Sequence, residues 1–126
     1  MTAKHNPNQC PMESILGQIM GAWTPYILWL LSNEKALRFG GLSARIPEIS
    51  AKVLTDRLRK LEASGLVHRD YQPTVPPTVS YSLTERGQEL HGVLQGLNEV
   101  ALRWDEEDRD KIAEGGAISV AAVAAD

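Results

Sequence analysis

The sequence has little of the chemistry that enzymes and metal proteins use. Its 126 residues include one cysteine and three histidines, His5, His68 and His91, which are far apart and lack the spacing of a metal site. A single cysteine also excludes an internal disulfide. Glycine-rich phosphate loops and serine nucleophile motifs are missing. We therefore expect no metal, no cofactor and no catalytic activity.

Long apolar runs and a secretory leader are missing as well. The longest apolar stretch, residues 23–31, is interrupted by Thr24 and Pro25 and is shorter than the roughly 20 residues that a membrane span requires. Residues 1–9 are polar, without the basic start and apolar stretch of a leader. These absences predict a cytoplasmic protein without membrane contact, and we expect residues 1–9 to form a flexible arm.

The net charge of −3 conceals an uneven distribution. Residues 35–72 include eight basic and four acidic side chains, whereas residues 105–126 include two basic and seven acidic ones. A positive middle segment suits a surface that contacts phosphates. A solvated face of any protein can show the same small excess, so charge alone leaves both interpretations open.

The length allows one domain, and the first half of it is predicted to be mainly helical. Apolar residues recur at helical spacing, and Thr24 followed by Pro25 is typical of an N-cap. The predicted elements are helices over about 12–20 and 24–31, a very short strand near 36–39, and a short helix over 40–46 that Pro47 ends.

The most informative segment is a predicted helix that Ser50 can cap and Gly65 can end. Two alternating segments, 66–71 and 79–83, then predict a β-hairpin, and prolines stiffen the loop over 72–78. This order of helices and hairpin is that of a winged helix-turn-helix, a mainly α fold with a small β-hairpin wing. In such a fold the second helix of the motif enters the major groove of double-stranded DNA.

One face of the helix after Ser50 has the side chains that read DNA. With Leu54 turned inward, helical geometry places Lys52, Asp56 and Arg59 on the opposite face and Thr55 at its edge. We expect Thr55, Asp56 and Arg59 to face bases, because arginine suits guanine and a carboxylate suits the amino group of cytosine. An exposed polar helix face is also often only solvated.

Phosphate contacts are expected around this face. Ser50 and Lys52, at the helix N-terminus, can hold a phosphate together with free backbone N–H groups. Arg38 and Arg69 are expected to contact the DNA backbone at the edges. Replacing Lys52 with alanine should then weaken binding to all sequences and lower the dependence on salt.

A last long helix begins after Thr84, which can cap it. Its apolar stripe can pack on its own domain, but it extends beyond a compact core, so we expect it to join two copies of the chain. The residues of this stripe that are spaced by seven are Leu90, Leu97 and Trp104. We predict that residues 10–104 form the DNA-binding and dimerisation domain and that residues 105–126 form a flexible acidic, alanine-rich tail.

Several motifs follow one another through most of the chain: Cys10-Pro11, Gly21-Ala22-Trp23, Leu37-Arg38-Phe39, Ile46-Pro47-Glu48-Ile49-Ser50, Val53-Leu54-Thr55, Leu58-Arg59-Lys60-Leu61-Glu62, Gly65-Leu66-Val67 and Pro76-Pro77 to Tyr81-Ser82-Leu83-Thr84. Together they resemble the HxlR-type transcription regulators. The resemblance implies a homodimeric winged-helix regulator, expected to be a repressor, that binds an inverted-repeat operator.

The resemblance also implies where the two copies meet and how the wing contacts DNA. The first and last helices would form the dimer, through Ile15, Leu16, Ile19, Leu90, Leu94, Leu97, Ala101 and Trp104. The family often has a basic residue after the paired prolines, whereas this sequence has Thr78. Wing contacts to phosphate would therefore be weaker or fall to Gln72, Thr74 or Thr78.

Cys10 is either a redox sensor or an indifferent cysteine. It precedes Pro11 at the expected start of a helix, where free N–H groups and the helix dipole favour a thiolate, while Glu13 opposes that effect. Some HxlR-type regulators are similar in using a cysteine at this place to sense oxidants or electrophiles. A small-molecule effector near the dimer interface is an alternative signal, with Trp23, Tyr26 and Trp29 as its lining or simply as core.

Two rival functions remain. A winged helix can serve as a protein-interaction module without DNA binding, but that use favours an apolar outward face rather than one with Lys52, Thr55 and Arg59. A cysteine-dependent enzyme would need a histidine near Cys10, and the one nearby in sequence, His5, is on the predicted arm.

Overall fold

The computed structural model of the chain describes residues 10–115. Its internal contacts divide the chain into two units, one ending at His91 and the other beginning at Gly92, and each is described by itself. The predicted arm, residues 1–9, and the end of the predicted tail, residues 116–126, lie outside the described residues.

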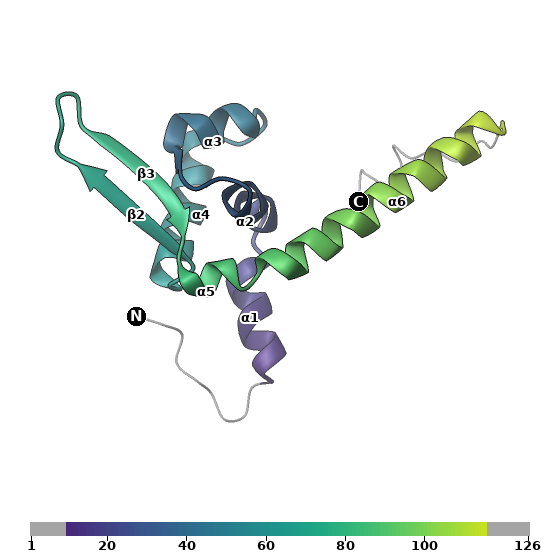
Figure 1. Ribbon diagram of the computed structural model, residues 1–126, viewed down its shortest axis with the longest axis horizontal. Helices are drawn as coiled ribbons and strands as arrows, with labels where there is room; N and C mark the ends of the chain where they lie inside the picture. Colours follow the sequence, from purple (N-terminus) through teal and green to yellow (C-terminus); the bar gives the residue numbers. More distant parts are fainter. Residues whose placement is uncertain (1–9, 116–126) are drawn as a thin grey trace. The chain divides into compact units, whose positions relative to one another are not determined.

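The first unit contains all the elements that the sequence predicts for a winged helix-turn-helix (Figure 1). The fold prediction is confirmed: the unit is mainly helical and has a small antiparallel sheet. Its elements are α1 (Pro11–Ile19), α2 (Thr24–Ser32), β1 (Leu37–Arg38), α3 (Phe39–Arg45), α4 (Ala51–Ala63), β2 (Val67–Gln72), β3 (Thr78–Leu83) and α5 (Glu85–Gln88).

Helix α4 begins and ends where its sequence predicts. The Ser50 hydroxyl accepts a hydrogen bond from the Val53 amide at 3.1 Å, which satisfies one of the free N–H groups of the first turn. Gly65 has a φ of 79°, and the Leu66 amide donates to the Leu61 carbonyl at 3.0 Å, which closes the C-terminal turn. A residue with a Cβ would be disfavoured at that φ.

The core of the first unit is formed by the inward residues of three helices and the sheet. Leu54, Leu58 and Leu61 of α4 are at most 1% exposed, and they share the core with α2, α3 and the ends of the strands. Burying each such side chain contributes about 1.5–3 kcal/mol. The other fully buried side chains are Ile27, Leu28, Leu31, Leu42, Ile46 and Val67.

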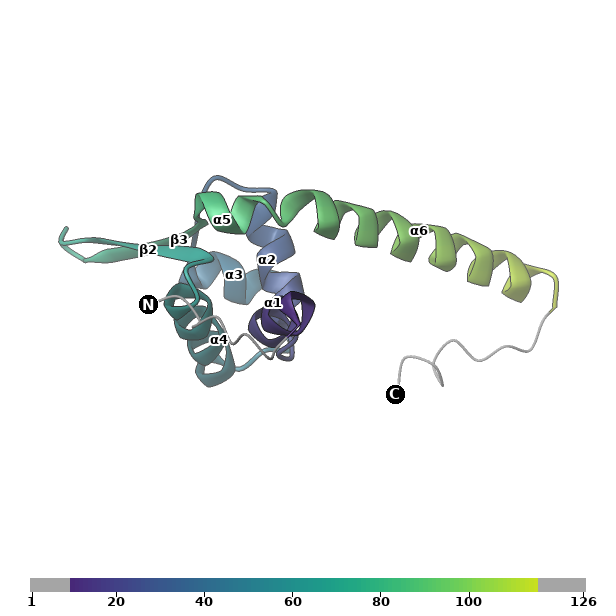
Figure 2. The ribbon, with the colours of Figure 1, turned by 90° about the horizontal axis from the view of Figure 1, so that it is seen from below.

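The sheet has the order β1-β3-β2, and all of its pairs are antiparallel. The register pairs Val67 with Leu83 and Gln72 with Thr78, so β2 and β3 form the predicted hairpin to within one residue. Figure 2 shows these two strands projecting beyond the helices of the unit. The hairpin therefore has the form of a wing.

Two helix boundaries differ from the prediction. The cap of α2 is Trp23, with a φ of 69°, and not Thr24, which is the first helical residue and is buried. Trp23 takes the cap position because its carbonyl accepts the first hydrogen bond of the helix, from the Ile27 amide at 2.9 Å. The Thr84 cap is confirmed, since its hydroxyl accepts from the Gly87 amide at 3.0 Å, but α5 is short and a turn interrupts the helix after Gln88.

The second unit contains most of α6 (His91–Ala113). The helix continues nine residues beyond Trp104, so the predicted tail is wrong over residues 105–113, which are helical. Glu106, Glu107 and Lys111 are good helix formers, and Arg109 Nε forms an ion pair with Asp105 Oδ2 at 3.2 Å, one turn apart.

Among the described residues no single helix is long and apolar enough to cross a membrane. The apolar helices α1 and α2 reach the necessary length and composition as a pair, and they are bent by 85° relative to each other.

Candidate nucleic-acid interface

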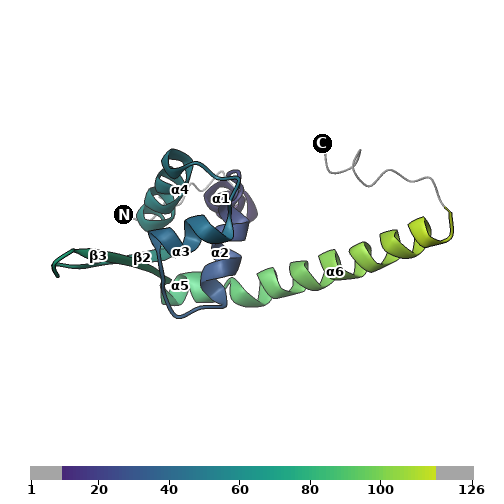
Figure 3. The same cartoon turned by 90° about the horizontal axis from the view of Figure 1, so that it is seen from above.

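The outward face of α4 is the surface that the sequence predicts. Lys52 and Arg59 are exposed and Thr55 and Asp56 are partly exposed, while the leucines of the helix point into the core. Figure 3 shows α4 at the edge of the helical part of the unit. The orientation derived from helical spacing is therefore confirmed, whereas the DNA contacts of these side chains stay a prediction.

A cleft of about 400 Å³ separates α4 from the wing. Thr55, Arg59 and Glu62 line it from α4, and Arg69 of β2 and Tyr81 of β3 line it from the sheet. Arg69 and Tyr81 are paired in the strand register. The cleft thus brings three of the predicted DNA contacts, Thr55, Arg59 and Arg69, to one place from two different elements.

A second hollow, of about 360 Å³, lies along α4 itself. Its lining includes Lys52, Thr55, Asp56 and Arg59, so all four predicted residues of this face meet there. Ser50 lies just before them as the N-cap, where its hydroxyl oxygen is occupied by the Val53 amide and its hydroxyl hydrogen stays available to a phosphate.

Asp56 is held more tightly than the sequence suggests. Its Oδ2 accepts a hydrogen bond from Arg57 Nη1 at 2.6 Å and lies 3.3 Å from Lys60 Nζ. The hydrogen bond from Lys60 lowers the pKa of the Asp56 carboxyl below its ordinary value, although partial desolvation acts in the opposite direction. One carboxylate oxygen is therefore engaged inside the protein, which limits how Asp56 can accept from a base.

The predicted contacts of the wing tip are spread out. Gln72 Nε2 donates to Asp70 Oδ2 at 2.9 Å, and Thr74 Oγ1 donates to the Pro76 carbonyl at 2.8 Å. Gln72 and Thr74 are exposed, and Thr78 is partly buried. These side chains lie along the hairpin and its loop and do not line the cleft beside α4.

Arg38 lies on β1, which pairs with β3 on the side opposite to β2. It is exposed and faces Ser80 in the register. The structure therefore does not bring Arg38 together with Arg69, the other arginine predicted at an edge.

Sequence reasoning missed three residues around this surface, namely Arg57, Glu62 and Tyr81. Tyr81 could have been found, because pairing the two predicted strands places it opposite Arg69. Glu62 follows Arg59 by three residues on the same helix face. No sequence pattern indicates Arg57, because its hydrogen-bond partner, the Ala22 carbonyl, is 35 residues away in the sequence.

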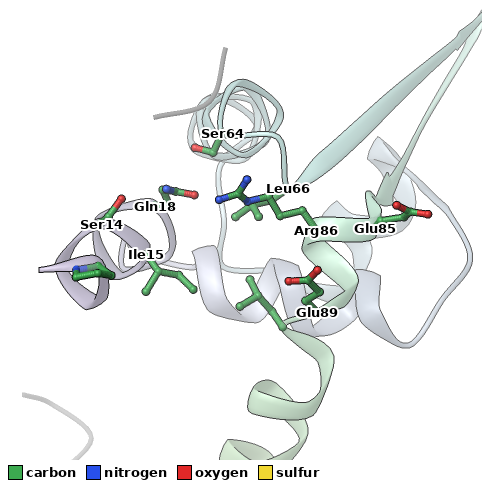
Figure 4. A pocket seen from close by; sticks show the side chains of 10 residues that line it. Ser14, Ile15, Gln18, Ser64, Leu66, Glu85, Arg86 and Glu89 are labelled. Carbon is green, nitrogen blue, oxygen red and sulfur yellow. The ribbon is translucent and has the colours of Figure 1, made fainter. Parts of the chain in front are cut away.

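Cys10 is exposed and is the N-cap of α1. Its side chain makes no capping hydrogen bond, while its carbonyl accepts from the Glu13 amide at 2.9 Å. A pocket of about 550 Å³ begins at the next residue, Pro11, and lies between α1, α5 and the end of α4. In Figure 4, Gln18 and Arg86 point toward each other in this pocket.

The predicted dimer residues fall into three groups. Leu90 and Leu94 are 8% and 7% exposed, so the single chain already buries them. Leu97 and Trp104 are 60% and 61% exposed, and Leu16 of α1 and Ala101 of α6 are exposed as well. The remaining two, Ile15 and Ile19, are partly buried.

Comparison with known proteins gives consistent matches over this region. A sequence model described as HxlR-like helix-turn-helix matches residues 18–109. The chain is 42% identical over 90 residues to an uncharacterized HTH-type transcriptional regulator of Methanothermobacter thermautotrophicus, covering 71% of this chain and 68% of the relative. It is 39% identical over 114 residues to the HTH-type transcriptional regulator YybR of Bacillus subtilis, covering 87% of each.

Solved structures show the same similarity. The HTH-type regulator ytcD is 35% identical with a TM-score of 0.73, covering 78% of this chain and 99% of that one. The oxidized form of the redox regulator HypR is 37% identical with a TM-score of 0.69, covering 78% and 96%. Quinone-bound YodB from B. subtilis is 33% identical with a TM-score of 0.62, covering 75% and 99%.

Proposed function

The chain belongs to the HxlR-like helix-turn-helix family of DNA-binding transcription regulators, and we propose that it represses transcription by binding an inverted-repeat operator as a homodimer. We also propose that the protein acts in the cytoplasm, where its operator would be, and that it has no catalytic role. One observation carries the DNA-binding part: α4 buries its leucines and presents Lys52, Thr55 and Arg59 outward.

This outward face favours DNA over a protein partner. Protein interfaces have an apolar centre that is depleted in charged residues. The described face of α4 is instead polar, and two arginines, Arg59 and Arg69, line its cleft with the wing. A surface of this kind suits phosphates and the acceptor edge of guanine.

The residue roles of the proposal follow from position. Ser50 and Lys52 bind a phosphate at the N-terminus of α4, and Arg69 binds the DNA backbone across the cleft. Thr55 and Arg59 face the bases, and Asp56 offers them its remaining carboxylate oxygen. Arg38, Gln72, Thr74 and Thr78 make peripheral backbone contacts, because they lie away from the cleft.

Exposed apolar side chains on two helices support the homodimer. Leu16 on α1 is 40% exposed, and Leu97 and Trp104 on α6 are more exposed still. Helix α6 has no buried apolar side chain after Leu94 among its described residues, so the rest of its stripe is free to pack on a second copy. Two copies related by a twofold axis would present two α4 helices to an inverted repeat.

A salt titration tests the proposal. The affinity of the wild type, Lys52→Ala and Lys111→Ala is measured on a random-sequence duplex at several salt concentrations. Lys52→Ala should bind more weakly and lower the salt slope by about 1, since one phosphate contact is lost. Lys111→Ala is the matched control on α6 and should leave both unchanged. If the wild type shows no salt-dependent binding, the protein-interaction alternative replaces this proposal.

We propose Cys10 as the site of the signal. HypR is a redox regulator and YodB has been solved with a quinone bound, which supports an oxidant or electrophile as effector here. The exposed Cys10 thiol would add through its sulfur to a ring carbon of a quinone, so that one C–S bond forms, one ring C=C π bond is broken and the thiol proton passes to the ring. With diamide as two-electron oxidant, two Cys10 thiols from different copies would form a disulfide.

The test compares affinity for a duplex selected from a random pool by the wild type, before and after diamide or quinone treatment. The wild type should change its affinity, and Cys10→Ser should not. Equal responses of the two proteins, or none, would eliminate Cys10 as the sensor.

A small-molecule effector is a second candidate signal, and the pocket at Pro11 supports it. The pocket has an apolar part at Ile15 and Leu90, and it also contains the guanidinium of Arg86 (Figure 4). This mixture suits a small ligand with one polar end. Trp23 and Tyr26 are exposed and do not line this pocket. A ligand that changes DNA affinity in wild type and Cys10→Ser alike would favour this signal.

A further inference from the structure

Arg57 lies on α4 beside the DNA-facing residues but points away from the cleft and hollow that they line. Its side chain is 22% exposed. Its Nε donates a hydrogen bond to the Ala22 carbonyl at 2.8 Å, and its Nη1 donates to Asp56 Oδ2 at 2.6 Å. A guanidinium used in this way joins two acceptors through its fixed planar geometry.

The acceptor at Ala22 belongs to the turn between α1 and α2. The turn continues with Trp23 at a φ of 69°, a conformation that is uncommon for a large side chain. It is also closely packed, because a Cβ added at Gly21 would lie 2.9 Å from Thr24 Oγ1 and 3.5 Å from Arg57 Nε. Arg57 is therefore built into this turn.

The turn is the place where α1 meets the rest of the unit. Helix α1 has no fully buried residue, and it lies beside α4 (Figures 2 and 3). With so little of α1 buried, the hydrogen bond from Arg57 to its C-terminal turn helps to hold α1 and the turn against α4. Arg57 thus connects the helix of the proposed DNA contacts with the helix that follows Cys10.

We propose that Arg57 is a positioning residue for DNA recognition, which ties α4 to the α1–α2 turn and fixes the carboxylate of Asp56 on the outward face of α4. The inference rests on the proposed entry of α4 into the major groove. Arg57 acts through Ala22 and Asp56 rather than by contacting DNA, because its side chain bonds to the α1–α2 turn and lines neither the cleft nor the hollow beside the predicted DNA contacts.

An arginine that contacts phosphate and an arginine that positions other residues have different effects on binding. A phosphate contact contributes to binding on every sequence and to the salt slope. A positioning residue affects how well base edges are read, so its loss lowers affinity for a preferred duplex more than for a scrambled one. The ratio of these two affinities therefore separates the roles.

The experiment uses the full chain and two probes: a duplex selected from a random pool by the wild type, and a scrambled duplex of the same composition. Arg57→Gln removes the charge and the fork, and Arg57→Lys keeps the charge alone. Arg109→Gln is the matched control, because it removes an arginine from an ion pair on α6. Thermal unfolding of each variant confirms that it is folded at the temperature of the binding assay.

Arg57→Gln and Arg57→Lys should both lower the affinity ratio about tenfold and leave the scrambled-duplex affinity and its salt slope unchanged, as for the loss of one base-reading contact. Arg109→Gln should keep the wild-type ratio. Amide exchange should accelerate around residues 21–27 in both Arg57 variants, because the turn loses its tie to α4.

Three outcomes would overturn the inference and leave the proposed function standing. An unchanged ratio in Arg57→Gln shows that recognition does not need Arg57. An equal loss on both duplexes with a lower salt slope shows that Arg57 contacts phosphate, and full rescue by Arg57→Lys shows that charge alone is needed. If the wild type selects no duplex at all, the proposed function fails, and the inference fails with it.

Discussion

Helices α4 and α6 are both amphipathic, but their apolar sides are buried to different extents. In α4 the leucines at positions 54, 58 and 61 are almost completely buried in the first unit. In α6 the stripe is buried only at its start, and Leu97 and Trp104 stay more than half exposed. A helix whose apolar side is satisfied can turn a polar face to DNA, whereas one whose apolar side is open needs a partner.

The largest effect should come from the buried side of α4. Leu58→Ala removes a fully buried side chain and leaves a cavity, so the free energy of unfolding should fall by about 2–5 kcal/mol. Urea unfolding followed by circular dichroism measures this change. Leu102→Ala on α6, where the side chain is 61% exposed, is the comparison and should shift unfolding little. Similar losses in both would remove the contrast between the helices.

The open side of α6 should matter for assembly instead. Trp104→Ala should weaken self-association by about 2 kcal/mol or more, which corresponds to a roughly 30-fold rise in the dimer dissociation constant. Sedimentation equilibrium over a range of concentrations measures it. A Trp104→Ala protein that associates like the wild type would show that α6 does not form the dimer, and a wild type that stays monomeric would exclude the homodimer itself.

The polar side of α4 should determine sequence preference. Arg59→Ala should cost about 1–3 kcal/mol of discrimination at one base pair of each half-site. Its affinity for random DNA should change least. Repeating the binding-site selection with the variant shows whether one position becomes degenerate. If the selected sequences keep their full preference, Arg59 is a phosphate contact and another residue reads the base.

The smallest effect concerns Asp56 and acid. Because the pKa of Asp56 is lowered below its ordinary 3.8 in the folded chain, its ion pairs stabilise the fold above that pH. The contribution should disappear as the pH falls through the lower folded value. The difference in unfolding free energy between wild type and Asp56→Asn should therefore be small, constant near neutral pH and vanishing below 3.8. A difference that grows in acid would have the wrong sign.

Most of the fold could be predicted because its signals are local. Ser50, Thr84 and Gly65 act within a few residues of the helix ends that they determine, and strand alternation places Arg69 and Tyr81 without distant information. The inward direction of the α4 leucines follows from their spacing alone. The wing and the outward face of α4 could therefore be predicted from the sequence.

The features that could not be predicted depend mostly on contacts between distant parts of the chain. The bond of Arg57 to Ala22 spans 35 residues, and no pattern indicates it. Trp23 takes a left-handed φ that its residue type disfavours, because the packed turn around Gly21 and Thr24 determines it. The end of α6 was placed too early, because an acidic run resembles a solvated tail until its pairing with Arg109 is known.

The most direct test of the account asks whether DNA covers the outward side of α4. The rates at which Lys52 and Lys111 are acetylated by a small reagent are measured by mass spectrometry, with and without a bound duplex. DNA should slow the reaction of Lys52 strongly and leave that of Lys111, on α6, unchanged. Equal reactivity of Lys52 in free and DNA-bound protein would contradict the account, because α4 would then not be the helix in the groove.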